Sequence, residues 1–377
     1  MKRKKMSKVR VLHILNELSL SGMEMMLLNS YSEWEENDIE ITILATGRNF
    51  GEAAKKLEAA GYRTIHIPFV DNKKNAFFQL KSFLKINRFD IIHINTEANF
   101  LLHVLNAYFS GHKIIVRTFH SVFQPRFLGK TRRIVDRIIA KLFLVKYISV
   151  GDSVAKNELK HYFTKSTLIY NWYDAKRFFI NSNEVKSKKR QELNISKDKF
   201  VVSIIGNCSR VKRHHLVLQA LSLLPDKIDW VLLHAGNEEP GFPERKLAVD
   251  LNISERCRFL GSVTNVEDIL NVSDVYIMSS KVEGLSIAAI ESMACGVPTI
   301  LTKSPGLTDL IDRIEEIKGV DSNAQEIAKS ICELENMTEY EKNQVSVNIA
   351  NKAYTLFSMK KGVKNYSNYY NHLLQPD

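Results

Sequence analysis

The sequence has few cysteines and lacks the spacing that would let them build a site. Four cysteines in 377 residues stand far apart, without a CxxC pair and without a histidine at metal-ligand spacing: Cys208, Cys257, Cys295 and Cys332. Zinc motifs and disulfide frameworks need closely spaced ligands or paired cysteines. We therefore interpret these cysteines as reduced core residues and expect no bound metal.

Long apolar runs are also lacking. No stretch approaches the roughly 18 to 20 apolar residues that a membrane helix needs. The basic start of the chain leads into the short apolar run 9–15 instead of a signal-peptide core with a cleavage site. These absences predict a cytoplasmic protein.

Acidic residues are outnumbered by basic ones, since 53 Lys and Arg stand against 42 Asp and Glu and give a net charge of +11. This excess predicts an anionic partner, and it leaves nucleic acids, acidic lipids and phosphorylated small molecules open. The sequence has no zinc finger, RNA-recognition aromatic motif or helix-turn-helix signature. A nucleic-acid-binding protein is therefore a remote alternative, and we expect no nucleic acid partner.

Short apolar runs alternate with stretches of helical period, which is the pattern of a parallel sheet covered by helices. The predicted strands are 9–15, 39–45, 64–67, 90–94, 113–117 and 147–150, then 200–205, 229–234, 256–260, 274–278 and 298–301. Between residues 171 and 199 the apolar period fades, and the chain is too long for one usual core. We predict an α/β protein of two Rossmann-like domains, 1–180 and 181–355, with parallel sheets facing across a cleft.

The segment 279–298 contains the residues that indicate chemistry. After a strand, Glu283, Gly284 and Leu285 form a predicted turn, Ser286 is the expected N-cap, and a helix over 287–294 ends before Gly296. The unpaired N–H groups and the positive end of such a helix suit a diphosphate. Gly284 would let that anion approach the backbone.

Two carboxylates flank this predicted anion site. Glu283 stands in the turn and Glu291 about five residues inside the helix, which separates them by roughly 7 to 8 Å along the helix axis. Because carboxylates accept paired hydrogen bonds from vicinal hydroxyls, one can bind a sugar and the other a ribose. The alternative for Glu291 is a solvated helix residue, although its neighbours are apolar.

The same segment resembles the family-four glycosyltransferases, whose signature is a glutamate, seven residues, a second glutamate and a Gly-x-Pro turn. Glu283, Glu291, Gly296 and Pro298 match it. The resemblance implies a GT-B fold and retaining transfer from a nucleotide sugar. It implies that Glu283 contacts the donor sugar and Glu291 the ribose, with the backbone of Gly284, Leu285 and Ser286 facing the sugar and diphosphate.

A second match follows the strand 200–205. Gly206 opens a loop in which Lys212 fits the lysine that the family places on the donor diphosphate, and Arg210 is a second candidate cation. Fixed cations stabilise the charge that develops on a departing nucleotide. The alternative is a basic helix start that is merely solvated.

The N-terminal half contains weaker matches. Asn171 resembles the asparagine of an Asn-Gly-x-Asp segment and is a candidate donor contact, while Gly22 and Glu24 resemble part of a Gly-Gly-x-Glu loop that admits donor and acceptor. His120 and His93 stand at or after the ends of predicted strands. By the resemblance His120 is a candidate for contact with acceptor or phosphate, whereas His93 is equally compatible with a structural role.

Two segments concern the surroundings of the reaction. In 124–147, basic and apolar residues interleave as on a helix, which fits either an anionic membrane surface or a helix packed on its own sheet. The final segment, 356–377, is expected to be a helix that crosses back to the first domain.

Together these observations predict a hexosyltransferase-type enzyme that moves a sugar from a nucleotide sugar to a glycan or lipid-linked glycan in cell-surface polysaccharide biosynthesis. The nucleotide sugar is a substrate, and we expect no cofactor and no metal. The inner face of an anionic membrane is a candidate partner. The alternatives are another GT-B enzyme, such as a sugar-nucleotide epimerase or a phosphorylase, and a binding protein without catalysis. The presence of Glu283, Glu291 and Lys212 argues against the last.

Overall fold

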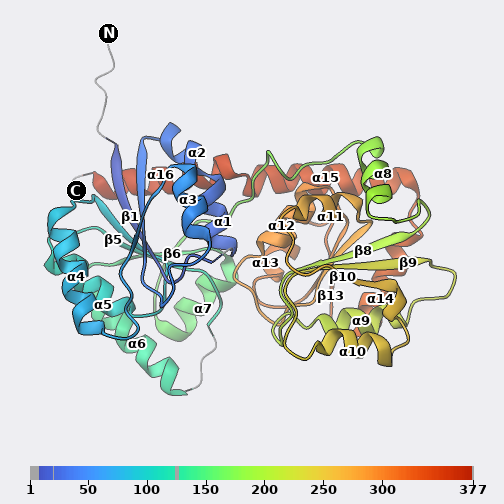
Figure 1. The fold of residues 1–377 in the computed structure, drawn as a ribbon, viewed down its shortest axis with the longest axis horizontal. Helices are drawn as coiled ribbons and strands as arrows, with labels where there is room; N and C mark the ends of the chain where they lie inside the picture. Colours follow the sequence, from blue (N-terminus) through green and yellow to red (C-terminus); the bar gives the residue numbers. More distant parts are fainter. Residues whose placement is uncertain (1–7, 20, 124–126, 376–377) are drawn as a thin grey trace, which may run out of the picture. The chain divides into compact units, whose positions relative to one another are not determined.

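The computed structural model describes residues 8–19, 21–123 and 127–375, and the chain divides into two compact units. The first unit consists of Met1–Asp174 together with Met359–Asp377, and the second consists of Ala175–Ser358. The sequence predicted that the second domain spans residues 181–355, whereas the second unit spans residues 175–358. The last helix, α16 (Met359–Leu374), belongs to the first unit, with which it is drawn in Figure 1.

The first unit is built on a seven-stranded sheet in the order β3-β2-β1-β4-β5-β6-β7, with every neighbouring pair parallel. The strands are β1 (Val9–Leu15), β2 (Ile39–Ala45), β3 (Arg63–His66), β4 (Ile91–Ile94), β5 (Ile115–Phe119), β6 (Lys146–Ser149) and β7 (Thr167–Leu168). Strand order reverses between β1 and β4. The carboxyl ends of these two strands therefore form the switch point at which open α/β sheets bind ligands.

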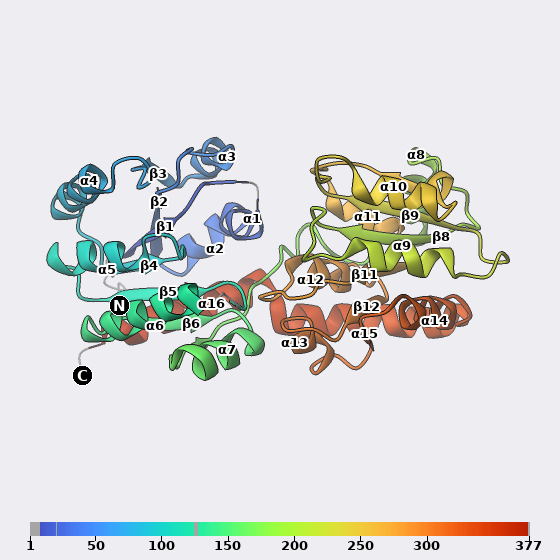
Figure 2. The same cartoon turned by 90° about the horizontal axis from the view of Figure 1, so that it is seen from below.

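The helices of the first unit form two groups. They are α1 (Gly22–Asn29), α2 (Tyr31–Glu36), α3 (Ala53–Ala60), α4 (Lys73–Ile86), α5 (Phe100–Phe109), α6 (Phe127–Leu142) and α7 (Asp152–Tyr162). Helices α4 to α7 pack each against the next, whereas α1 contacts α2 and α3, and α16 contacts α2 (Figure 2). This is the arrangement of a sheet covered on both faces.

Aromatic packing attaches α16 to the first unit. Trp34 of α2 lies 6.0 Å from Trp172 and 6.2 Å from Tyr366 between ring centroids, and it stacks on Tyr370 at 6.4 Å. A Cβ at Gly362 would lie 2.4 Å from the Trp172 ring, so only glycine lets α16 approach this closely. The periodic apolar positions of the last segment thus form the face that packs on this unit.

The second unit has a six-stranded parallel sheet in the order β10-β9-β8-β11-β12-β13. Its strands are β8 (Phe200–Ile205), β9 (Trp230–Ala235), β10 (Cys257–Phe259), β11 (Val275–Met278), β12 (Thr299–Thr302) and β13 (Lys318–Val320). Its helices are α8 (Asn183–Glu192), α9 (His214–Ser222), α10 (Pro243–Asp250), α11 (Val266–Val272), α12 (Ile287–Ala294), α13 (Thr308–Ile311), α14 (Ala324–Glu335) and α15 (Glu339–Phe357). Strand order reverses between β8 and β11, where the loops with the predicted site residues begin.

The prediction of two parallel sheets is confirmed. All eleven predicted strands correspond to strands of the structure, and β1, β2 and β8 have the predicted bounds. The described residues add two strands that were not predicted, β7 and β13, both at sheet edges. Within the described ranges, no helix combines the length and apolarity needed to cross a membrane.

Candidate functional site

Helix α12 begins where the sequence predicts it, directly after the loop that follows β11. Ser286 is its N-cap, with extended backbone, and its hydroxyl accepts a hydrogen bond from the Ala289 N–H at 3.3 Å. The chain leaves the helix through Gly296, whose φ of +70° favours glycine. The helix N-terminus therefore lies at the carboxyl end of the sheet with backbone N–H groups available to an anion.

Lys212 and Glu283 meet at this edge. The Lys212 Nζ lies 2.7 Å from the Glu283 Oε1, and the two side chains are 26% and 16% exposed. Lys212 comes from the loop after β8 and Glu283 from the loop after β11, and these two strands are neighbours in the sheet. Two residues separated by 71 positions in the sequence thus form one accessible ion pair beside the α12 N-terminus.

A third loop fixes the backbone of Glu283. The Glu283 N–H donates to the Pro305 carbonyl at 2.9 Å. Gly306 has φ +87°, and a Cβ there would lie 2.5 Å from the Glu283 carbonyl oxygen and 2.8 Å from that of Gly284. Glycine is therefore required at position 306, because any side chain would push the Glu283-Gly284 turn away.

Glu291 and Glu283 act on the same buried group. Tyr276 of β11 is completely buried, and burial, followed by the charges of Glu283 and Glu291, raises the pKa of its phenol well above the usual value. Glu291 itself is half-buried on α12. Glu283 lies in the loop that follows β11, and Glu291 lies on α12, the helix that this loop leads into.

Of the predicted cations, Lys212 pairs with Glu283, and among the described residues no contact places Arg210 at this pair. Arg210 is exposed and forms no ion pair within the described part of the chain. Sequence reasoning missed Arg213, whose Nε donates to the Ser279 carbonyl at 2.8 Å and whose Nη2 donates to the Ser280 carbonyl at 2.9 Å. Arg213 therefore ties the Lys212 loop to the end of β11.

Gly206 shapes the start of the Lys212 loop. Its φ of +141° is a glycine conformation, and a Cβ there would lie 3.6 Å from the Lys212 Cε. Leu285, the remaining residue of the predicted turn, is buried at 4% exposure.

The predicted residues of the first unit follow three different strands: Gly22 and Glu24 follow β1, His120 follows β5, and Asn171 follows β7. Gly22 is the first residue of α1, and Glu24 is buried and accepts a hydrogen bond from the hydroxyl of Ser21. Burial raises the pKa of Glu24, with the Ser21 hydrogen bond opposing this shift. Asn171 is also buried, at 8% exposure.

His120 and His93 have different surroundings. The His120 Nε2 lies 3.0 Å from the Asn95 Oδ1, and burial, with the charge of Arg117 next, lowers its pKa to about 3. His120 is therefore neutral at physiological pH. His93 is fully buried, with Nδ1 2.5 Å from the Tyr370 hydroxyl and Nε2 2.7 Å from the Thr118 hydroxyl. Both of its nitrogens are occupied, which gives His93 the structural role.

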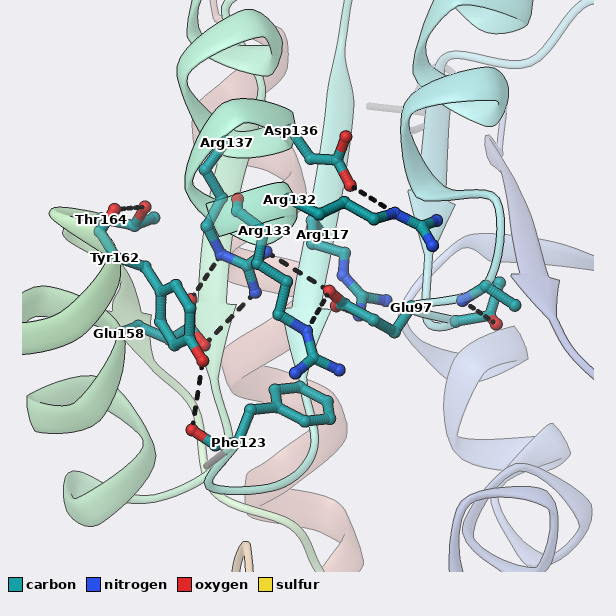
Figure 3. A network of polar contacts seen from close by, with 12 residues as sticks. Glu97, Arg117, Phe123, Arg132, Arg133, Asp136, Arg137, Glu158, Tyr162 and Thr164 are labelled. Atoms are coloured by element: carbon teal, nitrogen blue, oxygen red, sulfur yellow. Dashed lines mark hydrogen bonds and ion pairs between the residues drawn. The ribbon is translucent and has the colours of Figure 1, made fainter. Parts of the chain in front are cut away.

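A group of arginines and glutamates holds α6 onto the first unit (Figure 3). Arg133 donates to Glu97 at 2.9 Å, Arg117 donates to Glu97 at 2.8 Å, and Arg137 donates to Glu158 at 2.7 Å. Arg117, Arg137 and Glu158 are essentially buried. This pairing explains why Arg133 and Arg137 of the basic segment 124–147 point inward. The sequence pattern alone did not decide which residues of this segment face the sheet.

Comparison with known families covers both units. The family described as "Glycosyltransferase Family 4" matches residues 20–177, and the family described as "Glycosyl transferases group 1" matches residues 185–352.

Relatives in sequence and structure span nearly the whole chain. The UDP-Gal:alpha-D-GlcNAc-diphosphoundecaprenol alpha-1,3-galactosyltransferase of Escherichia coli is 23% identical, covering 95% of each chain. The capsular polysaccharide biosynthesis glycosyltransferase CapH of Staphylococcus aureus is 23% identical, over 75% of this chain and 78% of its own. The crystal structure of Anabaena HepE in complex with UDP and glucose has a TM-score of 0.83 at 17% identity, covering 97% of this chain and 100% of HepE. This last likeness establishes a common fold.

Proposed function

We infer that this chain, which belongs to the family-four glycosyltransferases and has their GT-B fold, transfers a hexose from a UDP-sugar to a lipid-linked glycan. In this proposal the transfer retains the configuration at the anomeric carbon. The Escherichia coli relative supports these donor and acceptor classes, and CapH supports a product of the cell-surface polysaccharide type. The observation that carries the proposal is the accessible Lys212–Glu283 pair beside the capped start of α12.

In this proposal the donor diphosphate lies at the N-terminus of α12, against the backbone of Gly284, Leu285 and Ser286. Lys212 exchanges its partner, leaving the Glu283 carboxylate for the diphosphate. Glu283 is then available to accept hydrogen bonds from the sugar hydroxyls, and Glu291 from the ribose. The ion pair thus holds both groups in place before the donor arrives.

The transfer step needs charge stabilisation more than it needs a protein base. The bond between the anomeric carbon and the diphosphate oxygen breaks, and the acceptor oxygen bonds to that carbon on the same face. The acceptor proton passes to a phosphate oxygen of the departing UDP. Lys212, Arg210 and the N–H groups of α12 stabilise the negative charge that UDP gains, so neither glutamate acts as a nucleophile.

We assign the candidate residues of the first unit to the acceptor and to the loop near the donor. His120 is neutral, so it can donate or accept a hydrogen bond without adding charge. Asn171, Gly22 and Glu24 complete this set. Because lysine, arginine and a helix N-terminus supply the positive charge, the proposal expects transfer without added Mg²⁺ or Mn²⁺.

The lipid-linked acceptor is supported by the outer side of α6. Val135, Ile138 and Leu142 follow one another at helical spacing and are 46%, 55% and 77% exposed. Arg132 beside them is 72% exposed in its side chain, while Arg133 and Arg137 hold the opposite side of α6 onto the unit. An apolar strip with basic neighbours suits an anionic membrane surface.

The proposal is tested by incubating the protein with UDP-hexoses, with and without an undecaprenyl-diphosphate-linked sugar. We expect UDP release that depends on the acceptor and a product with the anomeric configuration of the donor. Conversion of the sugar without UDP release would indicate an epimerase instead. Salt-sensitive oligonucleotide binding without any UDP-sugar binding would overturn the assignment.

A further inference from the structure

Three potential metal ligands meet inside the second unit, away from the Lys212–Glu283 pair. Cys208 lies in the loop after β8, His214 is the first residue of α9, and His234 belongs to β9. One ligand atom from each lies within 4.8 Å of the others. All three side chains are buried, with residue exposures of 6%, 4% and 1%.

The spacing suits a tetrahedral cation. Zinc binds thiolate sulfur at about 2.3 Å and imidazole nitrogen at about 2.0–2.1 Å, so sulfur and nitrogen ligands of one tetrahedral ion lie about 3.5 Å apart. The Cys208 Sγ lies 3.6 Å from Nε2 of the His234 ring, and one ligand atom from each of the three residues lies within 4.8 Å of the others, so small side-chain movements would bring them to this spacing. The His214 and His234 rings have centroids 5.0 Å apart, so a small movement of His214 would complete the set.

Glu244 lies on α10, which packs against α9, and it is the candidate for a fourth ligand. It is 8% exposed, and within the described part of the chain its Oε2 has no hydrogen-bond partner. The Nδ1 atoms of His214 and His234 are likewise buried without a partner there. Buried polar atoms without partners are costly, and a cation would satisfy them together.

We propose that Cys208, His214, His234 and Glu244 bind one zinc ion in a closed structural site. A thiolate, two imidazoles and a carboxylate form a ligand set that zinc accepts, and four protein ligands leave no open position for catalysis. The His234 Nε2 lies 3.0 Å from the Gly206 carbonyl, so Nδ1, which has no partner in the described part of the chain, is the nitrogen that binds the ion. Metal-bound histidines commonly donate to a carbonyl through their other nitrogen in this way.

The site has a consequence for the donor loop. Two ligands, Cys208 and His214, lie on either side of Lys212 in the sequence, and the other two come from β9 and α10. A bound ion therefore fixes both ends of the Lys212 loop to the sheet and to α10. The loss of the ion is expected to weaken UDP binding through the position of Lys212, without removing any group that contacts UDP.

The test measures metal content of the full chain. The protein is stripped with a chelator, loaded with Zn²⁺ and desalted, and zinc is measured by mass spectrometry; a parallel sample is titrated with Co²⁺. We expect about one ion per chain, a thiolate-to-cobalt charge-transfer band and visible bands of tetrahedral cobalt. Zinc loading should also raise the midpoint of thermal unfolding.

Matched variants locate the ligands. Cys208→Ser and His214→Gln should lose stoichiometric zinc and the charge-transfer band. Cys257→Ser, at another partly buried cysteine, and His215→Gln, at the exposed neighbour of His214, should keep both. Wild-type protein that fails to retain zinc and gives no thiolate band with Co²⁺ would overturn the proposal, and this result does not depend on whether any variant folds. Full zinc content in Cys208→Ser would overturn it as well.

Discussion

The two units use polar side chains near their strand ends in opposite ways. In the second unit, Lys212 and Glu283 form an ion pair that solvent reaches, with side chains 26% and 16% exposed. In the first unit, His13 and His93 are 2% and 0% exposed, and both bond to the Tyr370 hydroxyl. A charged, accessible pair can exchange a partner for a ligand. A buried neutral cluster can only stabilise the fold, here by holding α16 on the sheet.

Acid is expected to have the largest effect, and on the buried histidines of the first unit. Burial lowers the pKa of His13 and His103 to about 3, against about 6.5 in an unfolded chain. The unfolded chain therefore takes up these protons first, and stability present above pH ~6.5 is lost as the pH falls toward 3. For the two histidines we expect a loss of about 3 kcal/mol between pH 6.5 and 5, because the loss approaches about 1.4 kcal/mol per histidine and pH unit only below the unfolded pKa.

Fluorescence can assign this loss to the first unit. In a Trp230→Phe background the remaining tryptophans, Trp34 and Trp172, both lie in the first unit. Urea unfolding of this protein at pH 7 and pH 5 gives the pH dependence. Adding His103→Leu should reduce that dependence by about 1.4 kcal/mol per pH unit. An unchanged dependence would mean that His103 does not titrate on unfolding as described.

Lys212→Ala should have the largest effect on catalysis. Removal of a fixed donor of positive charge from a transition state lowers turnover by about 10² to 10³-fold. Because the Lys212 side chain is 26% exposed, the folded state should lose little stability. Steady-state kinetics and a thermal midpoint, compared with Lys227→Ala at an exposed lysine, separate the two effects. Equal kinetics in the two variants would contradict the proposed role of Lys212.

Tyr370→Phe should show the opposite pattern. The change removes the hydroxyl that bonds to His93 at 2.5 Å and to His13 at 3.3 Å, so it leaves buried nitrogens without that partner. We expect a loss of about 1–3 kcal/mol in unfolding free energy and unchanged activity per folded molecule. Tyr340→Phe, at a tyrosine that is 72% exposed, is the control for urea unfolding. A fall in turnover without a fall in stability would show that this cluster participates in catalysis.

The sequence predicted the elements better than the contacts between them. Helix α12 has the predicted bounds, because a serine cap, an apolar run and a glycine stop stand close together in the chain. Strands β7 and β13 were missed because two or three residues at a sheet edge have no measurable period. Strand order, and with it the pairing of Lys212 and Glu283, depends on long-range packing.

Other site residues were missed for the same reason. The role of Arg213 requires knowing that its loop lies beside the end of β11. Sequence spacing does not bring Cys208 together with His234, since these residues come from a loop and a strand that are far apart in the chain. Both His93 and His120 stand at strand ends, so the sequence favoured His120 only by resemblance. The structure adds that His93 is fully buried with both nitrogens hydrogen-bonded.

The smallest expected effect is on vesicle binding, and it distinguishes the two basic helices α8 and α6. On α8 of the second unit, Lys186, Lys189 and Arg190 pair with Asp274 and Asp268, so their charge is neutralised locally. On α6, by contrast, the apolar side chains of Ile138 and Leu142 are exposed to solvent.

Copelleting with anionic vesicles should therefore depend on α6. Each apolar side chain that enters the lipid surface contributes up to about 1.5–3 kcal/mol, and partial insertion reduces this to about 1 kcal/mol. Ile138→Ser with Leu142→Ser should weaken vesicle binding about tenfold or more. Val185→Ser on α8, at a position 41% exposed, should leave it unchanged. Equal binding of the two variants would mean that charge alone, and not the apolar strip of α6, attracts the protein to the membrane.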